Sequence, residues 1–179
     1  MSAVEKVVAA DGLVHPEPPE ALGGVAVGLT NATLRPSWSR LLLHLQVVRR
    51  GDVRRLPRLR SAADIHREFA VLADLDREAF LVLLLDQKHR VTGVHVVSVG
   101  TLAASLVHPR EVFKVALLGN AATIVVLHNH PSGDPTPSRE DREITLRLRE
   151  VGETLGIPLI DHVVIGAEGY RSFQELGLL

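Results

Sequence analysis

The apolar residues are distributed along the chain in a pattern that predicts an α/β domain from about residue 60 onward. Phe80–Leu85 and Ala121–His130 are largely apolar segments with the length of buried strands. Val91–Val99 is rich in valine, and the short polar turn before it predicts a hairpin with Phe80–Leu85. Pro158–Ile165 predicts a fourth strand, followed by a short tail.

Three helices are predicted between these strands, beginning after Ser61, at Pro109 and after Ser138. Each carries an apolar stripe with helical spacing, made up of Ile65, Phe69 and Leu72 in the first, Val112, Val115 and Ala116 in the second, and Ile144, Leu148, Val151 and Leu155 in the third. The order is helix, two strands, helix, strand, helix, strand. This order predicts a mixed β-sheet flanked by helices.

Residues 1–57 differ in character and predict an N-terminal extension, which leaves residues 58–179 as the folded domain. The extension contains a proline-rich stretch at His15–Pro19 and a Gly- and Ala-rich stretch at Ala21–Gly28. Leu41–Val48 is apolar enough to pack against a partner, so we expect a homo-oligomer to be possible through it. Six arginines lie within Arg49–Arg60 and predict a basic linker.

Composition narrows the candidate chemistry. The chain is 46% hydrophobic, 23% charged and has a net charge of −1, which is typical of a globular protein without a global field for nucleic acid. It contains no cysteine, so a transition metal has to be held by histidines and carboxylates. The start resembles no signal peptide and the apolar runs are too short to cross a bilayer. We therefore expect a cytoplasmic protein without membrane contact.

Two histidines at the end of a predicted buried strand are the main candidates for function. Side chains two residues apart in a strand point to the same side, so His128 and His130 can present both imidazoles to one point. A proline-rich loop follows, and Asp141 is the third residue after the predicted helix cap Ser138. Two imidazoles and one carboxylate are a typical Zn²⁺ ligand set that leaves a position open for water.

Each part of this pattern also has a structural explanation. A His-x-His pair in a strand is often no ligand, and Ser138-x-x-Asp141 is also a helix-capping pattern. Two imidazoles at the end of a buried strand are, however, costly to desolvate without a partner. The combination therefore favours a metal site.

The spacing His-x-His, seven residues, Ser, two residues, Asp resembles the JAMM motif of the JAB/MPN metallopeptidases. The segment His128–Gly133, with Val107–Glu111 before it and Asp161–His162 after it, is similar to the bacterial RadC branch of that family. The resemblance extends from Ser61 to Leu179. It implies a cytidine-deaminase-like α/β fold with a mixed sheet, and hydrolysis of an amide, peptide or isopeptide bond.

The resemblance also implies roles for individual residues. His128, His130 and Asp141 would hold a catalytic Zn²⁺, and Ser138 would help to stabilise the oxyanion. The family's glutamate general base matches Glu78, although the acidic stretch from Asp74 is equally typical of a solvated turn.

Three further residues near these motifs are weaker candidates. Glu111 is a second candidate for the base, but it more simply complements a helix dipole. Asp161 and His162 would form walls of the site. From the residues alone, His162 is more typical of a core histidine, or of one that orients a ligand, than of a fourth ligand.

A DNA-related function is the main alternative. RadC-like proteins carry a helical hairpin of the DNA-binding type ahead of the JAB domain, but residues 1–57 show no such pattern. The arginines of Arg49–Arg60 could contact phosphates, as in a DNA-repair factor or metal-dependent nuclease, or form a solvated linker. A non-catalytic MPN scaffold would require the loss of ligands that this chain retains. The substrate is not evident from the sequence.

Overall fold

The structure, a computed structural model, describes residues 59–100 and 107–179. The elements are α2 (Ala62–Phe69), the 3-10 helix η2 (Ala70–Asp74), β1 (Ala79–Leu85), β2 (Val91–Val99), α3 (Pro109–Leu118), β3 (Thr123–Asn129), α4 (Arg139–Leu155), β4 (Leu159–Gly166) and β5 (Gly169–Ser172). The predictions made for Leu41–Val48 and for the arginines from Arg49 to Arg58 lie outside the described residues. In the described part of the chain, no helix is long and apolar enough to cross a membrane.

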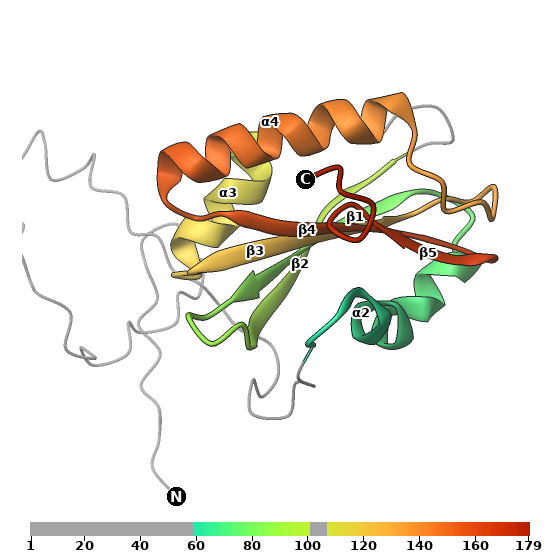
Figure 1. Cartoon of the computed structure of the whole chain (residues 1–179), viewed down its shortest axis with the longest axis horizontal. Coiled ribbons are helices and arrows are strands. Elements are labelled where there is room, and N and C mark those ends of the chain that lie inside the picture. Colours follow the sequence, from blue (N-terminus) through green and yellow to red (C-terminus); the bar gives the residue numbers. More distant parts are fainter. Residues whose placement is uncertain (1–58, 101–106) are drawn as a thin grey trace, which may run out of the picture. The chain divides into compact units, whose positions relative to one another are not determined.

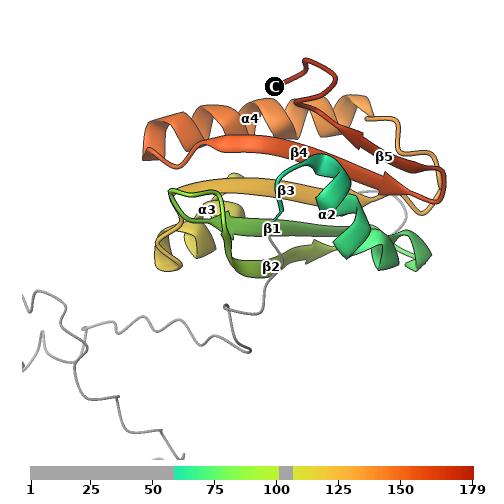
Figure 2. The same ribbon diagram turned by 60° about the horizontal axis from the view of Figure 1, so that its bottom comes forward.

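The strands form one mixed sheet in the order β2-β1-β3-β4-β5, which Figure 2 shows from its lower to its upper edge. β1 and β2 pair antiparallel, as expected of a hairpin. β1 and β3 are also antiparallel, β3 and β4 are parallel, and β5 runs antiparallel to β4. The α/β fold with a mixed sheet is therefore confirmed.

The sheet is covered on both faces, with α2 on one side and α3 and α4 on the other (Figure 1). This explains why β1 reads as a continuous apolar run, because a strand buried on both faces has no polar side. Phe80, Val82 and Leu84 contribute to the core under α3 and α4. Leu81 and Leu83 contribute to the core under α2.

The predicted helix starts are confirmed by their caps. Ser61 accepts a hydrogen bond from the Asp64 N–H at the start of α2, and Pro109 is at the first position of α3. α4 begins after Ser138 and ends at Leu155, and Gly156 caps it in the left-handed conformation with φ 68°.

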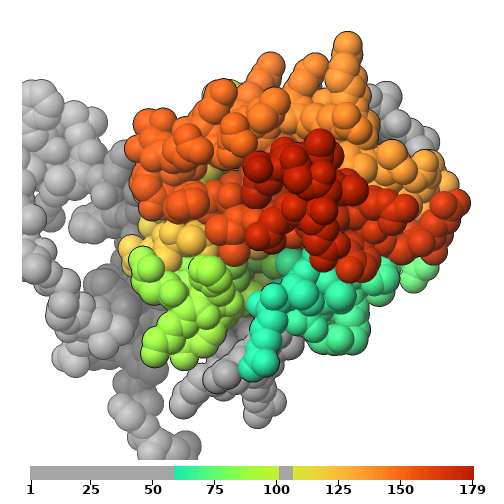
Figure 3. Space-filling model, in the orientation of Figure 1, coloured from blue at the N-terminus to red at the C-terminus, as the bar shows by residue number. Residues whose placement is uncertain are grey.

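Three details differ from the sequence-based expectation. The first helix ends at Phe69, so Leu72 is buried from the tighter turn η2. After Gly156 the backbone of Ile157 packs directly on Gly152. Leu155, which was expected in the core, is 40% exposed. The predicted tail contains β5 and the fully buried Phe173. In Figure 3 this last segment lies against the body of the domain next to α4.

Candidate metal centre

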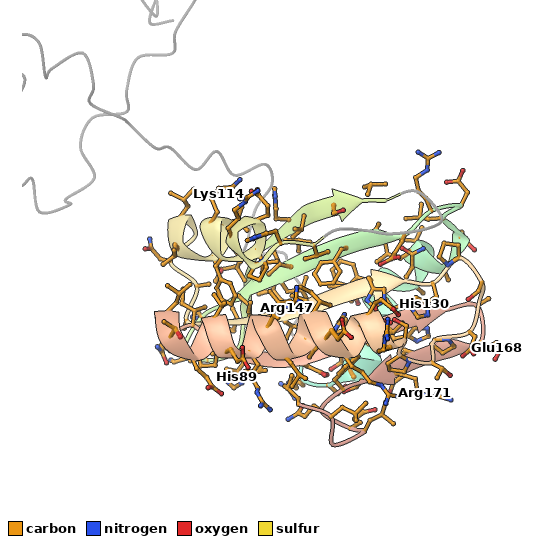
Figure 4. All side chains as sticks on the ribbon, turned by 90° about the horizontal axis from the view of Figure 1, so that it is seen from above. His89, Lys114, His130, Arg147, Glu168 and Arg171 are labelled. Atoms are coloured by element: carbon orange, nitrogen blue, oxygen red, sulfur yellow. The ribbon has the colours of Figure 1, made fainter. Side chains whose placement is uncertain are left out.

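The site forms where the end of β3 meets the beginning of α4. His128 and Asn129 are the last residues of β3, His130 follows directly after them, and Asp141 lies in the first turn of α4. In Figure 4, His130 lies close to the first turns of α4, at the end of the domain that also carries Glu168 and Arg171. The three predicted ligands are therefore brought together by two elements that are joined by the loop 131–137.

The ligand atoms converge closely. His128 Nε2 lies 3.0 Å from His130 Nε2 and 3.1 Å from Asp141 Oδ1, and His130 Nε2 lies 3.3 Å from Asp141 Oδ2. One ligand atom from each residue falls within 4.8 Å of the others, so this group could hold a metal ion. His128 is fully buried, whereas the His130 side chain is 18% exposed, so the group opens to solvent on the His130 side.

The separations show whether the three residues could share one ion. For metal–ligand distances of about 2.0–2.1 Å, the edge of a coordination tetrahedron measures about 3.3 Å. His128 Nε2 and His130 Nε2 are 3.0 Å apart, which is close to that edge length. The distances to Asp141 end on different oxygens of its carboxylate, and one oxygen lies within 4.8 Å of both nitrogens. The group could therefore hold a metal ion.

Asp141 is held as a carboxylate by its neighbours. Burial raises its pKa, but the close side chains of His128, His130 and Ser138 together bring the pKa far below its usual range. The pKa of His130 is raised, chiefly by its hydrogen bond with Asp141, while burial opposes that shift. A proton on His130 and a metal ion would therefore compete for the same nitrogen.

Ser138 is joined to Asp141 by a capping box. Its hydroxyl donates to Asp141 Oδ2 at 2.6 Å and accepts from the Asp141 N–H at 3.0 Å, while the Ser138 N–H donates to Asp141 Oδ2 at 2.7 Å. The capping explanation of Ser-x-x-Asp is thus correct. It does not compete with the metal-site explanation, because the cap orients the carboxylate that faces the two histidines.

The inner side of His128 contacts two residues on other elements. His128 Nδ1 lies 2.8 Å from Nε2 of His162 on β4, and His162 Nδ1 lies 2.6 Å from Oγ1 of Thr145 on α4. His162 therefore contacts the inner nitrogen of a candidate ligand and is not a member of the ligand group itself. This is the arrangement that the sequence favoured. Burial lowers the pKa of His162 well below its usual value. Thr145 was not predicted, although it follows Asp141 by one helical turn.

The outer side of His130 is fixed by the loop 131–137. His130 Nδ1 lies 2.8 Å from the carbonyl oxygen of Asp134. The Asp134 side chain accepts from the Thr136 N–H at 2.8 Å, which is the behaviour of a turn former. Gly133 has φ 90°, and its carbonyl accepts from the Glu168 N–H at 3.1 Å, so the turn before β5 supports this loop.

Glu78 comes immediately before β1 and is partly buried. Its charge makes a minor contribution to the raised pKa of His130. Phe80, two residues later, pairs with His128 across β1 and β3. Asn129, another residue that was not predicted, holds the backbone around Glu78. Asn129 Oδ1 accepts from the Ala79 N–H at 2.8 Å, and Asn129 Nδ2 donates to the Arg77 carbonyl at 3.1 Å.

Known proteins that are similar to this chain show which family it belongs to. The sequence profile of the family described as RadC-like JAB domain matches residues 59–178. The chain belongs to the RadC-like JAB domain family. It is 58% identical over 108 residues to UPF0758 protein STH371 of Symbiobacterium thermophilum. This match covers 60% of this chain and 46% of the relative.

Two further relatives agree with this assignment. A UPF0758 protein of Thermotoga maritima is 46% identical over 129 residues, covering 72% of this chain and 58% of the relative. A UPF0758 protein of Rubrobacter xylanophilus is 50% identical over 143 residues, covering 78% of this chain and 63% of the relative. The matches therefore span about half to two thirds of the length of these proteins.

Glu111 of this RadC-like JAB domain lies away from the three predicted ligands. Glu111 is in the first turn of α3 and bonds Lys114, which together with Arg110 keeps its pKa low. Its expected role at the helix N-terminus is confirmed, and no contact joins it to the described ligands.

Asp161 does not form a wall of the metal group, contrary to what the resemblance implied. It lies on β4 next to His162, but successive strand residues face opposite sides, so it points toward the α2 side. Its carboxylate accepts from Ser172 Oγ at 2.7 Å and from the N–H groups of His162 and Gln174. Burial raises its pKa and these hydrogen bonds oppose the shift. Asp161 therefore anchors the C-terminal segment.

Proposed function

We propose that this RadC-like JAB domain is a zinc-dependent hydrolase of the JAMM type that cleaves an amide, peptide or isopeptide bond. The observation that carries the proposal is the convergence of His128, His130 and Asp141: the two Nε2 atoms are 3.0 Å apart, and each lies within 3.3 Å of an oxygen of the Asp141 carboxylate. Two imidazoles and one carboxylate favour Zn²⁺ over Mg²⁺ or Ca²⁺, which prefer oxygen ligands alone.

The metal would supply one part of the chemistry. A bound zinc ion lowers the pKa of a coordinated water to about 7 and polarises a carbonyl oxygen. Glu78 is the proposed general base, which takes a proton from the attacking water and delivers it to the leaving amine. Its place in the chain supports this role, because Glu78 is two residues before Phe80, which pairs with His128 in the sheet.

Ser138 is the proposed donor to the oxyanion that develops on the substrate carbonyl. In the structure its hydroxyl donates to Asp141 Oδ2. The proposed role requires this hydrogen to turn from the carboxylate to the substrate, while the two backbone bonds of the capping box continue to hold Asp141.

The test is metal analysis of the purified full chain, combined with hydrolysis assays on peptide, isopeptide and small amide substrates. We expect one zinc per chain, loss of zinc and activity in His130→Ala, and retained zinc with lost activity in Glu78→Gln. Unchanged zinc content and hydrolysis in His130→Ala would contradict the proposal. Glu111→Gln is the matched acidic control, because Glu111 bonds Lys114 on α3.

A DNA-associated function is the second candidate, and the observation that favours it is the arginine cluster within Arg49–Arg60. In the described ranges acidic residues outnumber basic ones, so DNA affinity would have to come mainly from that cluster. We expect any such binding to weaken steeply with salt, and to be lost when Arg49, Arg50, Arg54 and Arg55 are changed to alanine. Absence of binding to duplex or single-stranded DNA at low salt would exclude this candidate.

A further inference from the structure

We propose that His162 and Thr145 are positioning residues that hold His128 in the tautomer and orientation required to bind the metal. The inference rests on the proposed metal site. It concerns residues behind the ligands, and it assigns a function to a fully buried histidine that contributes no ligand atom.

A chain of hydrogen bonds begins at Thr145 on α4. Thr145 Oγ1 lies 2.5 Å from the backbone carbonyl oxygen of Asp141. Two oxygens at that distance need a hydrogen between them, and only the hydroxyl has one to give. Thr145 therefore donates to Asp141 and can only accept from His162 Nδ1, 2.6 Å away.

The same count of hydrogens determines which nitrogens of His162 and His128 are protonated. His162 carries its proton on Nδ1, so in the neutral ring Nε2 has a lone pair. This lone pair accepts from Nδ1 of His128, 2.8 Å away. His128 then has its own lone pair on Nε2, the nitrogen that faces His130 and Asp141. A fully hydrogen-bonded chain thus leaves His128 ready to bind a cation.

Packing prevents His162 from turning out of this chain. Its ring is fully buried and stacks on Phe173 with ring centroids 4.7 Å apart. Phe80 packs edge-on against the same ring with centroids 5.5 Å apart. Phe80 also stacks on His128 at 5.8 Å. The two imidazoles are therefore held in their relative orientation by aromatic side chains as well as by the hydrogen bond.

The chain also joins the two elements that supply the ligands. It runs from His128 on β3 through β4 to the backbone of Asp141 on α4, and the Asp141 carboxylate returns to His128 Nε2 at 3.1 Å. His130 is held differently, by the Asp134 carbonyl of an exposed loop. The two histidine ligands therefore have different supports, side chains of β4 and α4 for His128 and a loop carbonyl for His130.

The experiment measures Zn²⁺ affinity of the full chain by competition with a chromophoric chelator. Thr145→Val removes the hydroxyl at nearly constant volume, and Thr145→Ser retains it. We expect Thr145→Val to weaken zinc binding about 10–100-fold and Thr145→Ser to remain close to wild type. Thr154→Val is the matched control, because Thr154 also bonds a carbonyl four residues earlier on α4 but contacts no histidine.

A second pair of variants tests His162 itself. His162→Phe keeps a ring between Phe80 and Phe173 but removes the acceptor, and we expect a loss of zinc affinity at least as large as in Thr145→Val. His162→Gln restores an acceptor and should recover part of that loss. Wild-type zinc affinity in both Thr145→Val and His162→Phe would overturn the inference while leaving the metal site intact.

Histidine tautomers provide a readout that does not depend on metal. In nitrogen-detected NMR spectra of the metal-free protein, we expect His162 to carry its proton on Nδ1 and to lack one on Nε2. A proton on His162 Nε2 would overturn the inference. If the wild-type protein bound no zinc, the proposed function would fail, and this spectrum would still decide whether the hydrogen-bond chain exists.

Discussion

Asn129 holds the backbone on both sides of Glu78. Its amide accepts from the Ala79 N–H and donates to the Arg77 carbonyl, and the side chain is fully buried. Asn129 lies between the two histidines but points to the other side of β3. The residue between the proposed ligands therefore positions the proposed general base.

Replacing Asn129 with alanine should separate positioning from metal binding. We expect Asn129→Ala to lower the free energy of unfolding by about 1–3 kcal/mol, because two backbone groups lose their partners. Hydrolysis should fall strongly while zinc content stays at the wild-type value. Denaturant titration, metal analysis and a hydrolysis assay test this. A variant that is destabilised but keeps full activity would contradict the positioning role of Asn129.

The pH dependence of zinc binding follows from His130. Its pKa is raised in the metal-free fold, so a proton occupies the ligand nitrogen at and below that pKa. We expect the apparent zinc affinity to fall about tenfold per pH unit as the pH decreases through this range, because one proton is displaced. Chelator competition at several pH values measures this slope, and a flat profile would contradict it.

The stability of the metal-free protein should change with pH in the opposite direction to the zinc affinity, falling as the pH rises through the pKa of His130. The raised pKa of His130 means that its ion pair with Asp141 contributes fully below the unfolded histidine value of about 6.5 and is lost as pH rises through the folded value. The lowered pKa of Asp141 means that its contribution is present above the unfolded value of about 3.9 and is lost only in strong acid. Thermal unfolding between these limits should therefore show a maximum in mildly acidic solution, and His130→Ala should flatten its alkaline decline.

Gly166 is a steric requirement of the loop that supports His130. A Cβ at this position would lie 2.2 Å from the Gly133 carbonyl oxygen and 3.0 Å from the Pro135 nitrogen. We expect Gly166→Ala to cost about 1–3 kcal/mol of stability and to weaken zinc binding, because the loop also presents the Asp134 carbonyl to His130. Gly93→Ala on β2, where the added atom meets only a side chain at 3.4 Å, is the control. Equal effects of the two substitutions would argue against the loop's role.

Asp161 should affect folding without affecting the metal. Asp161→Asn disturbs the hydrogen bonds to Ser172 and Gln174, so we expect the free energy of unfolding to fall by about 1–3 kcal/mol. Zinc affinity should stay within about twofold of wild type, a change below 0.5 kcal/mol. A large loss of zinc binding in a folded variant would mean that Asp161 acts on the site through its neighbour His162.

The sequence by itself determined the features that depend on local geometry. The alternation of a strand places His128 and His130 on one side, and a helix cap places Asp141 three residues after Ser138, so both could be predicted. The apolar runs of β1 and β3 likewise predicted a sheet buried on both faces.

Only the tertiary structure decided which residues support the ligands. β3 and β4 pair in a register that sets Val126 opposite His162, and a shift of one residue would turn His162 to the α2 side. His162 and His128 are 34 residues apart, and Asn129 and Ala79 are 50 apart. No local pattern encodes these pairs, because strand register follows from how the two apolar cores pack on the sheet.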